Sequence, residues 1–346
     1  MNIALATPTL RRNAIVFAIW LGVFIALGGG FFLLNGQSPL VLFWEMLVAA
    51  FGDAFAWSET LVKTAPILLC AMAAALPARL GLVSIGADGQ MYFGALIGTA
   101  VVLALPNESF WVLTPLMLGG AIVGGAIFGA IPGILKGGLG VNETISTLML
   151  NYIAALLVDY VVHGPWKDPG NLGWPATISF PEAAVLPTFF DTRAHAGLLI
   201  GVVAALVLYV LTAYSRWGLS LNIMQGNARL AQRAGLSFRK NVVVVMAIAG
   251  LLAGLAGIAE TSVIQGRLQS GISSGYGYTG FLVAWLAGPN FLRIIVISIL
   301  MGGLLASADM LQMVAHLPST TTYILQGLLF GSALAVGAVA RRRAMR

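Results

Sequence analysis

Long apolar runs separated by short polar segments repeat along this chain of 346 residues. An α-helix needs about 20 apolar residues to cross the hydrocarbon core of a bilayer, and about ten runs approach that length. They lie at 14–34, 60–80, 89–105, 111–135, 143–163, 196–214, 241–262, 276–289, 294–314 and 320–340. The pattern predicts an all-α integral membrane protein with one membrane domain over residues 1–346.

Two of these runs are short for simple spans and are interrupted by glycine or proline. The third run begins in the polar sequence 86–90, and the eighth lies between the glycine-rich segment 271–280 and Gly288-Pro289. Interruptions at corresponding places in two halves of a chain are typical of broken helices at a transport site. Ordinary glycine-packed helices explain either run alone equally well, but the pair favours broken half-helices.

Composition agrees with the pattern. The chain is 59% hydrophobic and only 9% charged, whereas soluble domains have about 25% charged residues. The single cysteine, Cys70, excludes an intramolecular disulfide and is interpreted as a small packing residue. The first run follows Arg11 and Arg12 as a signal peptide would, but no small-residue cleavage site clearly follows it. We therefore expect a retained first span at 14–34.

The basic residues indicate the orientation. Lys63, Lys167, Arg193 and Arg267 are the four of the 18 Lys and Arg residues that fall in segments expected outside. The others fall at the two termini and in the loops that alternate with those segments, and short Lys/Arg-rich loops remain in the cytoplasm. We therefore expect both termini inside. The net charge of +6 then reflects membrane topology and does not indicate a nucleic-acid partner.

The segment 215–241 is the most polar cytoplasmic loop. It contains five basic residues and no acidic residue, and 226–236 is typical of a short helix ended by glycine. A soluble partner could bind such a surface. The loop at 163–195 is expected on the other side; its five prolines and five Trp or Phe residues favour a folded segment that receives a binding protein, or one that only seals the outer face.

Several motifs then resemble a known family. The sequence 82–90 (LVSIGADGQ) resembles the Asn-Ile-Gly-x-Glu-Gly-Gln element of ABC-importer permeases of the branched-chain amino acid, ribose and nucleoside group. The sequences 140–152 and 164–169 look like segments of the nucleoside and simple-sugar branch, and 226–236 is similar to its coupling loop. In this chain Ser84 replaces the usual Asn and Asp88 the usual Glu.

The resemblance implies a type II ABC-importer permease fold in a bacterial inner membrane. It also implies several partners: ATPase subunits, a second permease in a homodimer or heterodimer, and an extracytoplasmic substrate-binding protein. The chain has no G-x-x-x-x-G-K-[S/T] phosphate loop, so we expect it to bind no cofactor itself and ATP to be used by the partner. It has no H-E-x-x-H motif, and its three histidines are scattered. We therefore expect no enzyme activity and no metal site.

Polar residues within or beside the spans are the candidate functional residues, because charge in a membrane is costly. For the solute pathway we predict Asp88, Gln90, Asn151, Tyr152, Tyr276 and Tyr278. For gate or structural roles we predict Gly86, Gly89, Asn142, Glu143 and Glu260. For contact with the ATPase we predict Asn227, Arg229, Arg233 and Gly235.

For each set a structural role is the alternative. Asn142 and Glu143 would cap a helix, and Asp88 and Gln90 would satisfy a broken helix. Tyr276 and Tyr278 would belong to an interfacial aromatic belt, and the arginines would hold the loop at the membrane surface. The path contains no Lys or Arg cluster, which favours a neutral polar solute.

The function expected is therefore translocation of such a solute, with nucleosides first and simple sugars second. A secondary transporter driven by protons or sodium is the alternative from another class, with Asp88, Glu143 and Asp309 as its ion ligands. A membrane enzyme or lipid-handling protein is disfavoured, because no catalytic cluster is present.

Overall fold

The computed structural model describes residues 7–170, 173–189, 192–227, 231, 233 and 235–344. Throughout these residues the regular structure is helical, and the extended pairs Ala176–Gln269 and Thr188–His195 are isolated bridges. Nine helices in the described chain are long and apolar enough to cross a membrane. The predicted all-α, multi-pass membrane protein is confirmed.

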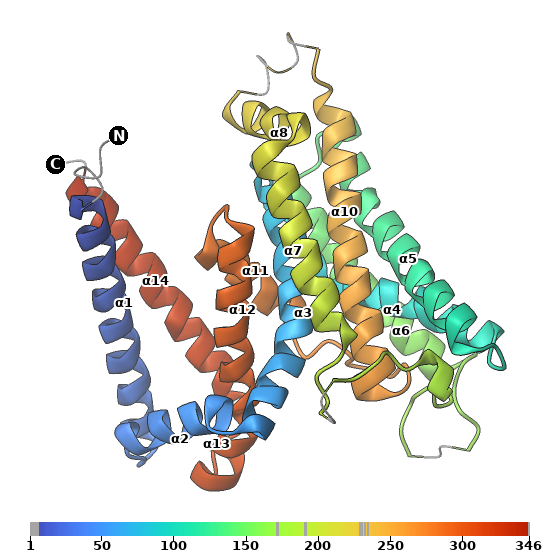
Figure 1. Ribbon diagram of the computed structural model, residues 1–346, viewed down its shortest axis with the longest axis horizontal. Coiled ribbons are helices and arrows are strands. Elements are labelled where there is room, and N and C mark those ends of the chain that lie inside the picture. The colour runs from blue at the N-terminus through green and yellow to red at the C-terminus, as the bar shows by residue number, and fades with distance from the viewer. Residues whose placement is uncertain are drawn as a thin grey trace. The chain divides into compact units, whose positions relative to one another are not determined.

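The helices follow one another along the chain as Figure 1 labels them. The order is α1 (Thr7–Leu34), α2 (Pro39–Phe51), α3 (Ala54–Ala78), α4 (Ala87–Ala104), α5 (Phe110–Leu139), α6 (Glu143–His163), η2 (Glu182–Ala184), α7 (Ala196–Tyr214), α8 (Arg216–Gly226), α10 (Phe238–Ala259), η3 (Glu260–Gln265), α11 (Tyr276–Ala287), α12 (Phe291–Ala306), α13 (Ala308–Ala315) and α14 (Thr321–Ala344).

The differences from the expected spans are local. The predicted eighth span is α11, a helix of only 12 residues, so nine of the ten predicted spans reach membrane-crossing length. The predicted third span is not interrupted: α4 is continuous for 18 residues, and Asp88 lies in its first turn. The ninth is divided instead, because α12 ends at Ala306 and α13 begins at Ala308. The short helix α2 was not predicted.

Contacts divide the chain into two compact units, residues 1–60 with 303–346, and residues 61–302. In the first unit α1 and α14 are antiparallel neighbours. The indole N–H of Trp20 donates to the carbonyl of Leu329 at 3.0 Å, and Gly28 lies beside Leu325. The start of α1 and the end of α14 therefore lie together (Figure 1).

The second unit is built around α4, α5 and α10, whose backbones touch. A Cβ on Gly250 would lie 2.0 Å from the Gly125 carbonyl oxygen, and one on Gly94 would lie 2.2 Å from the Gly254 Cα. Only glycine fits at such distances, and small residues are the usual means by which membrane helices approach closely. These contacts make the three helices the rigid centre of the unit.

The second unit has basic residues at both of its ends. At one end the Arg79 guanidinium donates to the Pro289 carbonyl, Gln225 donates to the Ala78 carbonyl at 3.2 Å, and Arg239 contacts Gly137. Arg267 lies beyond the far end of α10 and η3. Together these two helices have 28 residues, or about 42 Å at 1.5 Å per residue. Basic residues predicted for opposite sides thus lie at opposite ends.

Candidate functional site

The connection between α3 and α4 is an extended segment, Leu82–Ile85, with no neighbouring strand. Backbone N–H and C=O groups in a largely apolar protein must find partners, because an unpaired buried group costs as much as a lost hydrogen bond. For Val83 and Ile85 the partners are side chains of α6, which runs beside the segment.

Four residues on one side of α6 provide these partners, and we call Glu143, Thr144, Thr147 and Asn151 the α6 ladder. The first two bind Val83: a Glu143 carboxylate oxygen accepts its N–H at 3.3 Å, and the Thr144 hydroxyl donates to its carbonyl at 2.9 Å. Thr147 accepts the N–H of Ile85 at 3.3 Å. The ladder therefore holds the extended segment against α6.

Asn151 completes the ladder where the extended segment becomes α4. Its side-chain oxygen accepts the N–H of Gly89 at 2.8 Å, and its nitrogen donates to the Ile85 carbonyl at 2.8 Å and to the Tyr278 hydroxyl at 3.4 Å. A Cβ on Gly89 would lie 2.7 Å from the Asn151 Cα. Asn151 thus joins α4, α6 and α11, which fixes the start of α4.

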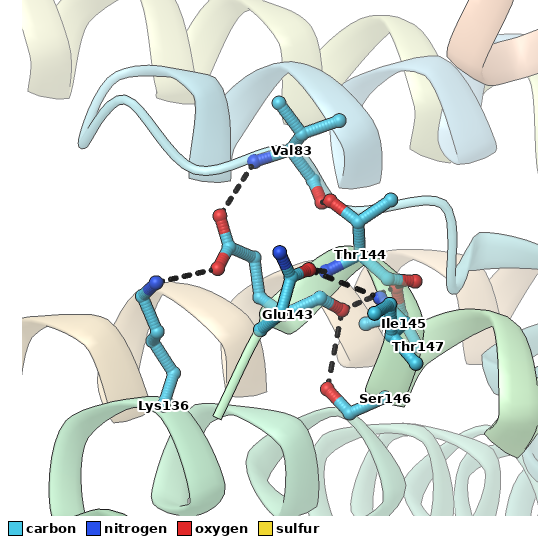
Figure 2. A network of polar contacts seen from close by, with 8 residues as sticks. Val83, Lys136, Glu143, Thr144, Ile145, Ser146 and Thr147 are labelled. Carbon is cyan, nitrogen blue, oxygen red and sulfur yellow. Dashed lines mark hydrogen bonds and ion pairs between the residues drawn. The ribbon is translucent and has the colours of Figure 1, made fainter. Parts of the chain in front are cut away.

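The start of the ladder is stabilised by a cap and an ion pair, shown in Figure 2. Asn142 caps α6, since its side-chain oxygen accepts the N–H groups of Thr144 and Ile145 at 2.9 and 3.2 Å. The Glu143 carboxylate lies 2.7 Å from the ammonium of Lys136 on α5. The capping role that the sequence allowed for Asn142 is observed, and the Glu143 carboxylate connects α6 to α5 and to Val83.

Asp88 connects α4 to the first turn of α11. One of its carboxylate oxygens accepts from the Ser273 hydroxyl at 2.5 Å and from the Gly277 N–H at 3.1 Å. A negative group beside a helix N-terminus also interacts favourably with the helix dipole. A Cβ on Gly277 would lie 2.3 Å from the Asp88 nitrogen, so α11 approaches α4 to backbone contact. Asp88 acts as a cap supplied by another helix.

Two other predicted polar residues are buried with an oxygen that has no partner. The side chains of Gln90 and Glu260 are 2% exposed, and one oxygen of each has no hydrogen-bond partner within the described chain. Glu260 begins η3, a π-helical turn of the kind that is frequent at functional sites. An unsatisfied buried polar atom calls for an explanation, such as a water or ligand.

The three predicted pathway tyrosines have different surroundings. Tyr276 is 1% exposed, and its hydroxyl lies 3.2 Å from the Lys63 ammonium. Tyr278 is 38% and Tyr152 62% exposed, and both adjoin Asn151, through the bond to Tyr278 and through the chain to Tyr152. The partly exposed ring of Tyr278 therefore lies beside a buried amide, whereas Tyr152 is a neighbour of Asn151 along the chain.

The structure describes part of the 215–241 segment, in which 226–236 resembles a coupling loop. The first part of the 215–241 segment forms α8, which was not expected. The Ala231 N–H donates to the Asn227 carbonyl and the Leu236 N–H to the Ala231 carbonyl, both at 3.0 Å. Gly235 has φ +79°, the left-handed conformation that commonly ends a helix. The predicted glycine end is thus observed. Arg233 is exposed, and Arg229 lies outside the described residues.

The loop predicted at 163–195 packs on η3 and on the residues that follow it. The Thr177 N–H donates to the Leu268 carbonyl at 2.9 Å, and the Ser262 hydroxyl donates to the Ala184 carbonyl at 2.6 Å. At the end of the loop, His195 caps α7 by accepting the Gly197 N–H at 3.1 Å, and burial lowers the pKa of this histidine to about 4. The loop is therefore an integrated part of the second unit.

Sequence reasoning missed four residues of this site: Lys136, Thr144, Thr147 and Ser273. One signal for part of the ladder was present, because Glu143, Thr147 and Asn151 are polar residues four positions apart in an apolar run. That spacing places side chains on one face of a helix. Ser273 had no such signal, since its partner Asp88 is 185 positions away.

Comparisons with known proteins agree with this architecture. Residues 56–334 match the model of the family described as branched-chain amino acid transport system / permease component. The glucose ABC transporter permease protein TsgB13 of Haloferax volcanii is 31% identical over 318 residues, which cover 88% of this chain and 83% of that protein.

Two further relatives come from nucleoside systems. The guanosine ABC transporter permease protein NupP of Bacillus subtilis is 30% identical, covering 91% of this chain and 90% of that protein. The nucleoside ABC transporter permease protein NupB of Lactococcus lactis is 28% identical, covering 83% and 80%. The chain therefore belongs to the branched-chain amino acid transport system permease family and is the permease component of an ABC transporter.

Proposed function

We propose that this permease translocates a neutral polar solute, most specifically nucleosides, inward across the cytoplasmic membrane of a bacterium. ATP hydrolysis by a separate ATPase subunit drives it, and an extracytoplasmic binding protein delivers the solute. The termini and the 215–241 segment face the cytoplasm. A second permease, identical or different, completes the pathway.

The observation on which the proposal depends is the junction of α4, α6 and α11. There the buried amide of Asn151 donates to the hydroxyl of the partly exposed Tyr278, and Tyr152 follows Asn151 on α6. Aromatic faces can stack on a nucleobase, which in nucleic-acid systems contributes about 1–3 kcal/mol per base, and an amide can exchange hydrogen bonds with it. The unpaired oxygen of Gln90 adds an acceptor.

The charge at this junction supports a neutral solute. None of the six predicted pathway residues is a Lys or Arg, and the ammonium of Lys63 donates to the hydroxyl of the buried Tyr276. A phosphorylated solute would need a group of cations. The similarity to guanosine and nucleoside permeases supports the nucleoside class.

Simple sugars are the second candidate, because a glucose permease is similar over 88% of the chain. A sugar could also use the tyrosine rings and the amide of Asn151. The ion-coupled alternative has less support. Asp88 is bonded to Ser273 and Gly277 and Glu143 to Lys136, so the two carboxylates have separate partners.

Uptake by the assembled complex in proteoliposomes tests the proposal. Guanosine, adenosine, uridine, glucose and ribose are each supplied with ATP or with a non-hydrolysable analogue. The proposal expects ATP-dependent uptake of nucleosides and little uptake of the two sugars. Preferential uptake of glucose or ribose would replace the nucleoside assignment by the sugar one.

Variants of Tyr278 test whether the junction of α4, α6 and α11 contacts the solute. Tyr278→Ala removes the ring beside Asn151 and should reduce nucleoside uptake, whereas Tyr278→Phe keeps the stacking face and should retain most of it. Tyr214→Ala is the matched control, because that tyrosine is exposed and lies at the end of α7, outside the junction. Equal losses for Tyr278→Ala and Tyr214→Ala would remove the junction from the pathway.

A further inference from the structure

The first turn of α10 abuts the last turn of α5. A Cβ on Gly137 would lie 3.2 Å from both the Cα and the carbonyl oxygen of Arg239, while one on Gly138 would lie 3.6 Å from the Arg239 guanidinium. Backbone of α10 therefore rests on Gly137, and only a flexible side chain faces Gly138. Because α10 begins inside the 215–241 segment, a displacement of that segment reaches α5 at Gly137.

Lys136 precedes this contact and connects it to α6. Its ammonium lies 2.7 Å from the Glu143 carboxylate, and the two side chains are 27% and 11% exposed. Glu143 is the first residue of α6 and also accepts the N–H of Val83 at 3.3 Å. Figure 2 shows Lys136 and Val83 bonded to the same carboxylate. One side chain thus joins α5, α6 and the extended segment before α4.

The α6 ladder continues from Glu143 toward the tyrosines. Glu143 and Asn151 are eight positions apart, or about 12 Å along a helix. Asn151 binds Gly89 and Tyr278. Every step from Gly137 to Tyr278 is therefore a hydrogen bond, an ion pair, a backbone contact or a rigid helix.

A second connection leaves the 215–241 segment through α8. The Gln225 amide donates to the Ala78 carbonyl at the end of α3 at 3.2 Å, and Gly218 is in backbone contact with Thr212 on α7. Neither contact involves the ladder. The two connections are separate in the structure, so they can be tested against each other.

We propose that Gly137, Lys136 and Glu143 are positioning residues. They transmit a displacement of the 215–241 segment to the α6 ladder and to the junction of α4, α6 and α11. This inference rests on the proposed function and adds the route by which an ATPase partner acts on the pathway. Coupling between distant sites needs contiguous packed elements, and altering one of them changes coupling by about 0.5–2 kcal/mol.

The experiment compares variants of the full complex in proteoliposomes. It measures ATP hydrolysed per molecule of solute taken up, using the solute of the five-member panel that the wild type transports best.

Gly137→Val is paired with Gly138→Val, since both add the same side chain to one helical turn. Glu143→Gln keeps an oxygen that can accept the Val83 N–H but loses the ion pair with Lys136. Together with Lys136→Gln and the double variant, it forms a double-mutant cycle. Gln225→Ala interrupts the other connection.

The inference expects Gly137→Val and Glu143→Gln to raise the ATP-to-solute ratio about threefold or more, with Gly138→Val and Gln225→Ala near wild type. The double variant should be no worse than either single variant, because the pair acts as a unit. Melting temperatures are measured alongside. A purely structural role would lower the melting temperature and the amount of complex without changing the ratio, and that result would overturn the inference.

Failure of the inference and failure of the proposed function have different signatures. If the wild-type complex hydrolyses ATP without taking up any panel solute, the proposed function fails and the inference with it. If wild-type uptake is normal and the ratio changes only in Gln225→Ala, the inference alone is overturned. The α8 connection would then be the route.

Discussion

The Asn151 side chain accepts the backbone N–H of Gly89 at 2.8 Å, across 62 positions of sequence. The same side chain donates to the Ile85 carbonyl. One amide thus satisfies both an N–H and a C=O where an extended segment turns into α4. Amides suit this task, since they combine donor and acceptor without a charge.

Replacing Asn151 should destabilise the protein. Asn151→Ala leaves the Gly89 N–H and the Ile85 carbonyl without their partner, and each unpaired buried group costs about 1–3 kcal/mol. We expect a clearly lower melting temperature for the detergent-solubilised protein. Tyr152→Phe is the control, because Tyr152 is 62% exposed. Equal melting temperatures for Asn151→Ala and wild type would contradict the role of Asn151 in satisfying Gly89 and Ile85.

Helix contact at Gly94 gives a second prediction. A Cβ there would lie 2.2 Å from the Gly254 Cα, so Gly94→Ala must separate α4 from α10. Overpacking of this kind costs about 1–3 kcal/mol or more. Gly119→Ala is the matched control, since no atom lies within 4 Å of its added Cβ. We expect a lower melting temperature and less folded protein only for Gly94→Ala; similar behaviour of both would argue against backbone contact.

Variants of Asp88 distinguish a structural role of this carboxylate from a role in ion coupling. Asp88→Asn keeps an oxygen that can accept from Ser273 and Gly277 but cannot bind and release a proton. We expect uptake close to wild type for Asp88→Asn and a large loss for Asp88→Ala, which removes the acceptor. Loss of uptake in Asp88→Asn at an unchanged melting temperature would favour the ion-coupled alternative.

Acid should weaken the packing of the 163–195 loop through His195, which ends that loop and caps α7. Burial lowers its pKa to about 4 from the ordinary 6.5, so the unfolded state binds more protons between those values. Stability is therefore complete above pH 6.5 and falls as the pH drops through this window, by up to about 1.4 kcal/mol per pH unit.

Thermal unfolding between pH 7.5 and pH 4.5 checks this prediction. His195→Asn retains an acceptor for the Gly197 N–H, as asparagine is a good helix cap, and does not titrate. Its melting temperature should depend less on pH than that of the wild type. Parallel curves for the two proteins would assign the acid sensitivity to other groups.

The hydrophobic pattern was enough to predict most of the fold. Nine long runs correspond to membrane-length helices, because an apolar segment in lipid has to satisfy its backbone internally. The run at 276–289 was harder to interpret, since Gly275 and Gly288 both adopt positive φ and limit α11 to 12 residues. Hydropathy measures apolar length; it does not report where the backbone leaves the helix.

The candidate site was predictable as residues but not as contacts. The cost of burying polar groups singled out Asp88, Gln90, Asn151 and Glu260 for pathway or gate roles; all four are buried, and their roles stay predictions. Their partners could not be predicted, because the extended segment before α4 binds a face of α6 more than 60 positions away. Tyr152 shows the limit most clearly: it adjoins buried Asn151 in sequence, yet helical geometry turns it outward.

The energy source of transport tests the central claim most directly. Membrane vesicles that contain the complete complex are loaded with ATP, or depleted of it, and guanosine uptake is measured with and without a protonophore. The account predicts uptake that requires ATP and persists when the proton gradient is collapsed. Uptake that continues without ATP and stops with the protonophore would contradict it.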